Sequence, residues 1–134
     1  MIGSHANLMI ADTYFKNESG FDVERAYAAM VNTATVENQP HAGRDGLNDY
    51  IQNGYVSEES RSKGASLTLA YAYDDWAIGQ IAAALGKTNE SAVFLKRGQN
   101  YRNVWDPKAQ FMCPRFKNGT FHCPDILNLS LIHI

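Results

Sequence analysis

Leu69-Ala-Tyr-Ala-Tyr-Asp-Asp-Trp-Ala-Ile-Gly-Gln80 places two adjacent carboxylates at the centre of an apolar segment. Apolar residues recur there with the spacing of an α-helix over about residues 66–85, and Gly86 ends the pattern. A helix that is apolar on nearly every side is typically buried. Because a buried carboxylate without partners is costly, we expect Asp74 and Asp75 either to be hydrogen-bonded in a structural network or to face a polar cavity that holds a ligand.

The central residues of this helix fall on different faces. Asp74 shares a face with large apolar residues, and Asp75 lies about 100° further round, among small residues that suit close helix packing. Trp76 lies on a third face, near Tyr73. For each Asp, a purely structural role is the alternative interpretation, because buried polar groups usually cap a helix or accept a hydrogen bond from an arginine or a tyrosine.

The rest of the chain predicts an all-α fold with a short irregular hairpin near the C-terminus. Four further helices are expected over about residues 5–16, 22–33, 46–52 and 88–103. Asp22 is the expected N-cap of the second helix, and Gly54 follows the third. The hairpin is expected around Asn118-Gly119. Short turns between the helices favour antiparallel helix pairs.

The composition excludes several classes of protein. The chain has 134 residues, enough for one modest domain, and its 45% of hydrophobic and 19% of charged residues are not the composition of a disordered chain. The formal charge of -2 provides no basic field for nucleic acid. No apolar run approaches the ~20 residues of a membrane span, and the opening MIGSHANLMIAD lacks the pattern of a signal peptide.

Two features near the C-terminal end each have two interpretations. Cys113 and Cys123 flank the expected turn, and they either form a disulfide in an oxidising compartment or remain free thiols. Asn118-Gly-Thr120 is an N-glycosylation sequon, which has meaning only in a eukaryotic secretory pathway. An Asn-Gly turn accounts for the same residues without any sugar.

The last six residues differ from the rest of the chain. Leu129-Ser-Leu-Ile-His-Ile134 is a short apolar run without a cap or a turn signal. It matches the in-frame translation of a transposon mosaic-end adapter used in sequencing libraries. We therefore expect residues 1–128 to be the native part and residues 129–134 to be a non-native tail. An ordinary apolar C-terminus is the alternative.

Several short stretches, taken together in their order and spacing, resemble glycoside hydrolase family 92. The resemblance covers nearly the whole chain up to about Asp125. The main stretches are Met1-Ile-Gly-Ser-His-Ala6, Ile10-Ala-Asp-Thr-Tyr14, Gly46-Leu-Asn-Asp-Tyr-Ile51, Ser66-Leu-Thr-Leu-Ala-Tyr-Ala-Tyr-Asp-Asp-Trp76, Ala83-Ala-Leu-Gly-Lys87 and Asn100-Tyr-Arg-Asn103.

The resemblance implies a fold and an activity. Members of the family are calcium-dependent exo-α-mannosidases that invert the anomeric centre, and they combine an N-terminal β-sandwich with an (α/α)6 toroid. This chain is then expected to be a partial toroid, residues 1–128 of the catalytic domain, with the segment around Asp74 as an inner helix. Its partners would be a mannose-containing glycan, the rest of its own catalytic domain and the β-sandwich domain. The parent protein is expected to be extracellular or periplasmic.

The same resemblance puts the chemistry outside this chain. Inverting hydrolysis needs a carboxylic acid and a carboxylate base about 6.5–9.5 Å apart on opposite sides of the sugar, and the diverging Asp74 and Asp75 cannot provide that arrangement. The family's general acid is a Glu and its base an Asp, both beyond the end of this chain, as are most calcium ligands. We therefore expect no catalytic residue, no metal ligand and no activity in the isolated fragment.

What the chain can contribute is the wall of a sugar pocket. The candidates are Asp74, Asp75, Trp76, His5, Asp12 and Arg115. His5 and Asp12 share a face of the first helix, and Arg115 lies in Met112-Cys-Pro-Arg115 where the family tends to have Met-Arg-Pro-Arg. The alternatives are a structural histidine, a surface carboxylate and, for Trp76, core packing.

Two other functions remain open from the sequence. The helices can form a binding or interaction module without chemistry, since no complete catalytic constellation is present in the chain. The parent can also be another exo-glycosidase built on the same toroid, which activity on glucosides instead of mannosides would reveal.

Overall fold

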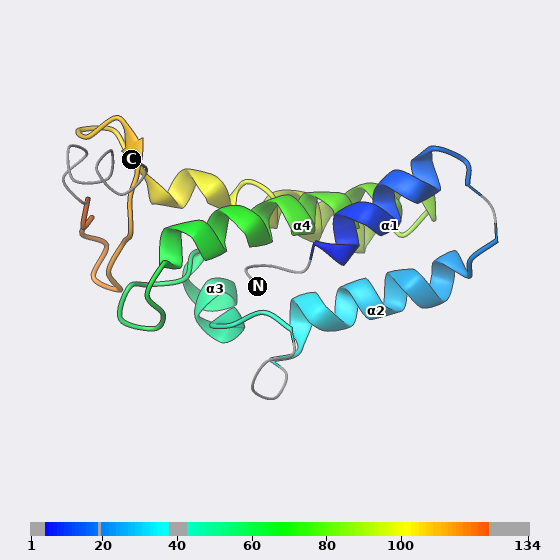
Figure 1. Cartoon of the computed structure of the whole chain (residues 1–134), viewed down its shortest axis with the longest axis horizontal. Helices are drawn as coiled ribbons and strands as arrows, with labels where there is room; N and C mark the ends of the chain where they lie inside the picture. Colours follow the sequence, from blue (N-terminus) through cyan, green and yellow to red (C-terminus); the bar gives the residue numbers. More distant parts are fainter. Residues whose placement is uncertain (1–4, 19, 38–42, 124–134) are drawn as a thin grey trace, which may run out of the picture.

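The computed structural model describes residues 5–18, 20–37 and 43–123, and nearly all of their regular structure is helical (Figure 1). The helices are α1 (Ala6–Phe15), α2 (Val23–Thr35), α3 (Leu47–Asn53), α4 (Gly64–Ala84), α5 (Thr88–Arg97) and the 3-10 helix η1 (Asn100–Val104), followed by the two-residue strands β1 (Trp105–Asp106) and β2 (Phe111–Met112). The expected all-α fold with antiparallel helix pairs and a short hairpin is confirmed for these residues.

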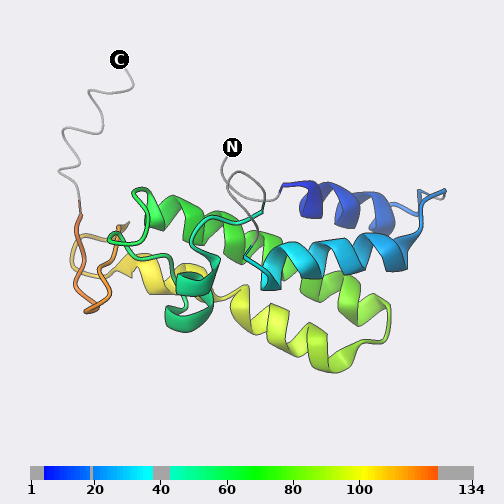
Figure 2. The same ribbon diagram turned by 90° about the horizontal axis from the view of Figure 1, so that it is seen from below.

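The long α4 organises the molecule. Figures 1 and 2 show it running through the structure, with α1 and α2 at one end and the C-terminal hairpin at the other. It packs against α1, α2, α5 and η1. Three buried apolar clusters form the core, and each of them includes residues of α4, such as Ile78 in the first, Tyr71 in the second and Ala65 in the third. The helix is therefore buried on most sides, as its sequence predicts.

The small residues of α4 permit close packing of α5. A Cβ atom added at Gly79 would lie 2.9 Å from Leu95 Cδ2 and 3.0 Å from the Leu95 backbone nitrogen. The Ser91 hydroxyl of α5 donates a hydrogen bond to the Gly79 carbonyl at 3.0 Å. Thr68 and Ala72 lie on the same face of α4 as Gly79 and are also buried. Ala83, at the end of this face, is exposed.

Most expected helix boundaries are found, and one is wrong. Asp22 caps α2 by accepting from the Arg25 backbone N–H at 3.0 Å, and Gly54 ends α3 in a left-handed conformation with φ of 78°. The fifth helix, however, ends at Arg97 and not at residue 103. A Cβ atom at Gly98 would lie 3.1 Å from Trp76 Cβ, so α4 and the chain approach closely there, and the backbone continues as 3-10 helix.

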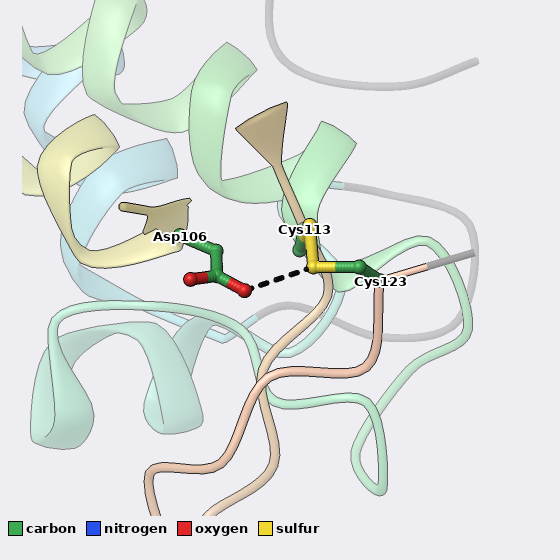
Figure 3. Close-up of side chains that lie close together, drawn as sticks. All are labelled: Asp106, Cys113 and Cys123. Carbon is green, nitrogen blue, oxygen red and sulfur yellow. Dashed lines mark hydrogen bonds between the residues drawn. A yellow bond between two sulfur atoms is a disulfide. The ribbon is translucent and has the colours of Figure 1, made fainter. Parts of the chain in front are cut away.

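Within the described residues, two short hairpins follow η1, and a disulfide closes the second. In the first hairpin, β1 and β2 pair antiparallel, with Trp105 opposite Met112. In the second, Arg115 and Phe121 form an antiparallel bridge, and Cys113 and Cys123 are joined at its base (Figure 3). The disulfide interpretation of the two cysteines therefore holds, and the free-thiol interpretation is wrong. Asp106 Oδ2 lies 3.2 Å from Cys123 Sγ. A disulfide sulfur carries no hydrogen to donate, so this is a close contact without a hydrogen bond.

No helix within the described ranges is long and apolar enough to cross a membrane. The expected tail, residues 129–134, lies outside the described residues.

Candidate functional site

Both carboxylates of the central helix are fully buried. Asp74 and Asp75 each have 0% of their surface exposed, because α4 is covered by α1, α2, α5 and η1. The question raised by the sequence is then what each carboxylate contacts, and the structure gives the two residues different surroundings.

Asp75 is the centre of a buried ion-pair network. Its Oδ1 accepts from Arg44 Nη1 at 2.6 Å, and its Oδ2 accepts from Arg97 Nε at 2.7 Å and from the Tyr50 hydroxyl at 3.3 Å. Arg97 also donates to the Ala34 carbonyl of α2 at 2.9 Å. One carboxylate thus joins α4 to α3, to α5 and to the segment before α3, and through Arg97 to α2. This is a structural network, which satisfies both oxygens of Asp75.

Aromatic rings complete the surroundings of the two arginines. The Arg44 guanidinium lies 5.1 Å from the ring centre of Tyr71, and that of Arg97 lies 5.4 Å from Tyr50. Such contacts offset part of the cost of burying a cation. Burial raises the pKa of Tyr50, and the charge of Asp75 raises it further, so the Tyr50 hydroxyl stays a neutral donor. The Asp75 carboxylate thus pairs with two cations, Arg44 and Arg97.

Asp74 lies on the side of α4 that carries Tyr71. Burial raises the pKa of Tyr71 to about 12, with smaller contributions from the charges of Asp45 and Asp74. The Tyr71 hydroxyl donates to the Asp45 carbonyl at 2.9 Å. Asp74 is enclosed by this part of the core and does not line the open groove described next.

An open groove of about 380 Å³ runs between α1 and α4. Trp76 is 42% exposed there and stacks on Tyr73, with ring centroids 5.8 Å apart. Asp12 lines the same groove from α1, together with Gln80 of α4. The Asp12 carboxylate forms an exposed ion pair with Lys16 at 2.7 Å. Exposed aromatic rings beside a carboxylate and an amide offer both an apolar face and hydrogen-bonding groups to a ligand.

The other two candidates lie elsewhere. His5 is exposed at the start of α1 and is not among the residues that line the groove. Arg115 lies in the disulfide-closed hairpin, with its guanidinium 5.1 Å from the ring centre of Tyr55 and 4.9 Å from that of Phe121. It donates to the Asn103 carbonyl at 3.0 Å. These contacts hold the hairpin against the rest of the structure.

The six residues that the sequence singles out therefore occupy separate places. Only Asp12 and Trp76 share an open groove. Sequence reasoning missed Arg44 and Arg97, the partners of Asp75, because they are 31 and 22 residues away from it along the chain. Arg97 lies in the last turn of α5, a position typical of a cation that interacts with its own helix terminus. Its position in the sequence therefore did not indicate that it pairs with Asp75.

One cluster of side chains that can bind metal ions lies beside the disulfide. The one group of three metal-ligating side chains in ranges 5–18, 20–37 and 43–123 consists of Asp106, Cys113 and Cys123, and the two sulfurs are joined to each other. Calcium takes six to eight oxygen ligands, so this group does not suit it.

The network around Asp75 predicts a large loss of stability on substitution. Asp75→Asn removes the charge that pairs with Arg44 and Arg97, and breaking a buried pair from one side costs about 3–5 kcal/mol. Asp12→Asn is the control, because it removes an exposed pair worth about 1 kcal/mol or less. Equilibrium urea unfolding of both variants measures the loss in the free energy of unfolding that each substitution causes. Equal losses in the two variants would contradict the structural role of Asp75.

Comparison with known protein families supports the resemblance seen in the sequence. Residues 1–128 match the model of the glycosyl hydrolase family 92 catalytic domain. A curated relative from the fungus Arthroderma benhamiae, described as an uncharacterized secreted glycosidase, is 31% identical over 97% of this chain. The chain spans only 20% of that relative.

Solved structures from Bacteroides thetaiotaomicron share the same fold. A family GH92 α-mannosidase is 40% identical over 93% of this chain, with a TM-score of 0.83, and was also solved with mannoimidazole. A family GH92 inverting mannosidase is 31% identical over 93% of the chain, with a TM-score of 0.87. The chain covers 16% and 17% of these two proteins. It is a fragment that belongs to glycoside hydrolase family 92 and forms part of the helical catalytic domain.

Proposed function

We propose that the protein from which this chain derives removes terminal α-linked mannose from glycans by inverting hydrolysis. The observation that carries the proposal is the match of residues 1–128 to the family 92 catalytic domain. It is supported by the similarity to an α-mannosidase and to an inverting mannosidase, each over 93% of the chain. The structure of a relative with mannoimidazole further supports a mannose-containing substrate. The relative described as secreted supports action outside the cell.

In this proposal the chain supplies scaffold and pocket wall, and the acid and base come from outside it. Both oxygens of the buried Asp75 already accept hydrogen bonds from Arg44, Arg97 or Tyr50, which suits a structural role. The groove between α1 and α4, with Trp76 and Asp12, offers exposed aromatic rings and a carboxylate to a sugar. The stacked rings would pack on the apolar face of the pyranose, and the Asp12 carboxylate would accept hydrogen bonds from its hydroxyl groups.

Calcium is part of the proposal for the parent protein, with ligands from segments outside this chain. The Asp106, Cys113 and Cys123 group does not provide such a site, for the reason given above. None of the roles assigned here to Asp12, Asp75 or Trp76 depends on the ion.

One prediction of this proposal concerns the reaction of the full-length protein. It is expected to cleave an aryl α-mannoside and to release β-mannose first, because inversion exchanges the anomeric configuration. Polarimetry or NMR of the first product identifies the anomer, and an α-glucoside is the matched control substrate. Removal of calcium with a chelator should abolish the activity, and added calcium should restore it.

An α-anomer as first product would contradict inversion, and preferential cleavage of the glucoside would favour another exo-glycosidase. The 134-residue chain alone should be inactive on both substrates.

A second prediction concerns the groove. Trp76→Ala in the full-length protein should lower kcat/KM for the mannoside about tenfold, which corresponds to ~1.4 kcal/mol of lost interaction. Trp105→Ala is the matched control, because Trp105 is 43% exposed and Trp76 42% exposed, and Trp105 lies away from the groove in β1. Steady-state kinetics compare kcat/KM of the two variants with that of the parent protein. Indistinguishable kinetics would exclude Trp76 from the pocket wall.

A further inference from the structure

The sequence contains four N-glycosylation sequons, and two of them have different surroundings in the structure. They are Asn17-Glu-Ser19, Asn89-Glu-Ser91, Asn118-Gly-Thr120 and Asn128-Leu-Ser130. Ser19 and residues 128–130 lie outside the described residues. The sequons at Asn89 and Asn118 are described completely, so their geometry can be compared. Both asparagines are exposed, which means that exposure alone does not distinguish them.

Asn118 lies at the tip of the disulfide-closed hairpin. The Phe116 N–H donates to the Thr120 carbonyl, and the Gly119 N–H donates to the Phe116 carbonyl, both at 2.9 Å. Gly119 has φ of 89°, which a residue with a side chain rarely adopts. The Asn-Gly turn expected from the sequence is therefore present. It places Asn118 and Thr120 together at an exposed tip, where a bulky group can be attached without disturbing the core.

The hydroxyl of this sequon contacts its own asparagine. Thr120 Oγ1 donates to Asn118 Oδ1 at 2.7 Å, and the Thr120 backbone N–H donates to the same oxygen at 2.9 Å. Two donors on the amide oxygen polarise the amide and favour loss of a proton from its nitrogen. The third residue of the sequon is thus already positioned beside the amide that would be modified.

The sequon at Asn89 lacks this arrangement. Asn89 is in the first turn of α5, and Ser91 is buried, with its hydroxyl donating to the Gly79 carbonyl of α4 at 3.0 Å. The Ser91 hydroxyl therefore serves the contact between α4 and α5 and faces away from Asn89. The same three-residue motif has a structural use here and offers no accessible hydroxyl in the folded protein.

The hairpin also indicates the compartment. The disulfide between Cys113 and Cys123 forms and persists in oxidising compartments such as the lumen of the endoplasmic reticulum. N-glycans are attached to secreted proteins at surface loops. A relative 31% identical to the chain is described as a secreted glycosidase and comes from a fungus. One hairpin thus combines a disulfide with an exposed sequon.

We propose that Asn118 is an N-glycan acceptor and that Asn89 is not. The donor is an oligosaccharide linked to a lipid pyrophosphate. Asn118 Nδ2 attacks the anomeric carbon of the first sugar, and the new N–C bond replaces the bond between that carbon and the pyrophosphate oxygen. The lipid pyrophosphate leaves with the bonding electrons, and the amide proton passes to a base of the transferase. The inference is independent of the proposed mannosidase activity.

The test is secretion of the full chain from a eukaryotic host, followed by peptide mapping before and after treatment with a peptide N-glycosidase. We expect a glycan on the peptide that contains Asn118, and an unmodified peptide for Asn89. Asn118→Gln and Thr120→Ala should each lose this glycan, and the conservative Thr120→Ser should retain it. Asn89→Gln is the matched control and should leave the glycan pattern unchanged.

An unmodified Asn118 in the secreted chain would overturn the proposal. Equal modification of Asn89 and Asn118 would overturn the structural distinction between them. Retention of the glycan on Asn118 in Thr120→Ala would show that the contact between hydroxyl and amide oxygen is not used.

Discussion

The fold depends on the ion pairs of Asp75 inside the helix bundle. A buried carboxylate is tolerated when both of its oxygens have hydrogen-bond partners, and two arginines and a tyrosine provide them here. The three partners come from different parts of the chain and meet at one residue of α4. Removing the carboxylate would leave buried cations, so the packing of α3 and α5 on α4 depends on it. The apolar clusters provide most of the buried surface, and the Asp75 network fixes how the helices are arranged.

This constraint also separates scaffold from recognition within the chain. One turn of α4 holds Asp75 in the network and Trp76 in the open groove, because adjacent residues of a helix point in different directions. The groove side carries exposed aromatic rings and the Asp12 carboxylate. The opposite end of the molecule carries the hairpin, which Arg115 and the disulfide hold in place. The proposed sugar contacts and the proposed glycan therefore lie on different parts of the structure.

Sequence periodicity predicted most of the helical fold. The apolar pattern located α4, and local rules located Asp22 as a cap and Gly54 as a helix end. The fifth helix was predicted too long, because the close approach of Gly98 to Trp76 is a tertiary contact that no local pattern reveals. The pairing of Cys113 with Cys123 was open from the spacing alone and needed the hairpin geometry.

The site was less predictable than the fold. The sequence showed that Asp75 needed partners, but Arg44 and Arg97 are distant in the chain and become neighbours only after folding. Asp12 and Trp76 were singled out separately, and only the packing of α1 on α4 brings them to one groove. The proposed activity rests on the membership of family 92 and not on a constellation of the described residues.

The most direct test of the account is the turnover of Asp75→Asn in the full-length protein, expressed per folded molecule and measured beside its Tm. A structural Asp75 predicts a clearly lower Tm with kcat, per folded molecule, within a few-fold of the parent protein. An unchanged Tm together with a loss of kcat of about 1,000-fold or more, the size expected for removal of a catalytic group, would contradict the account and make Asp75 part of the catalytic machinery.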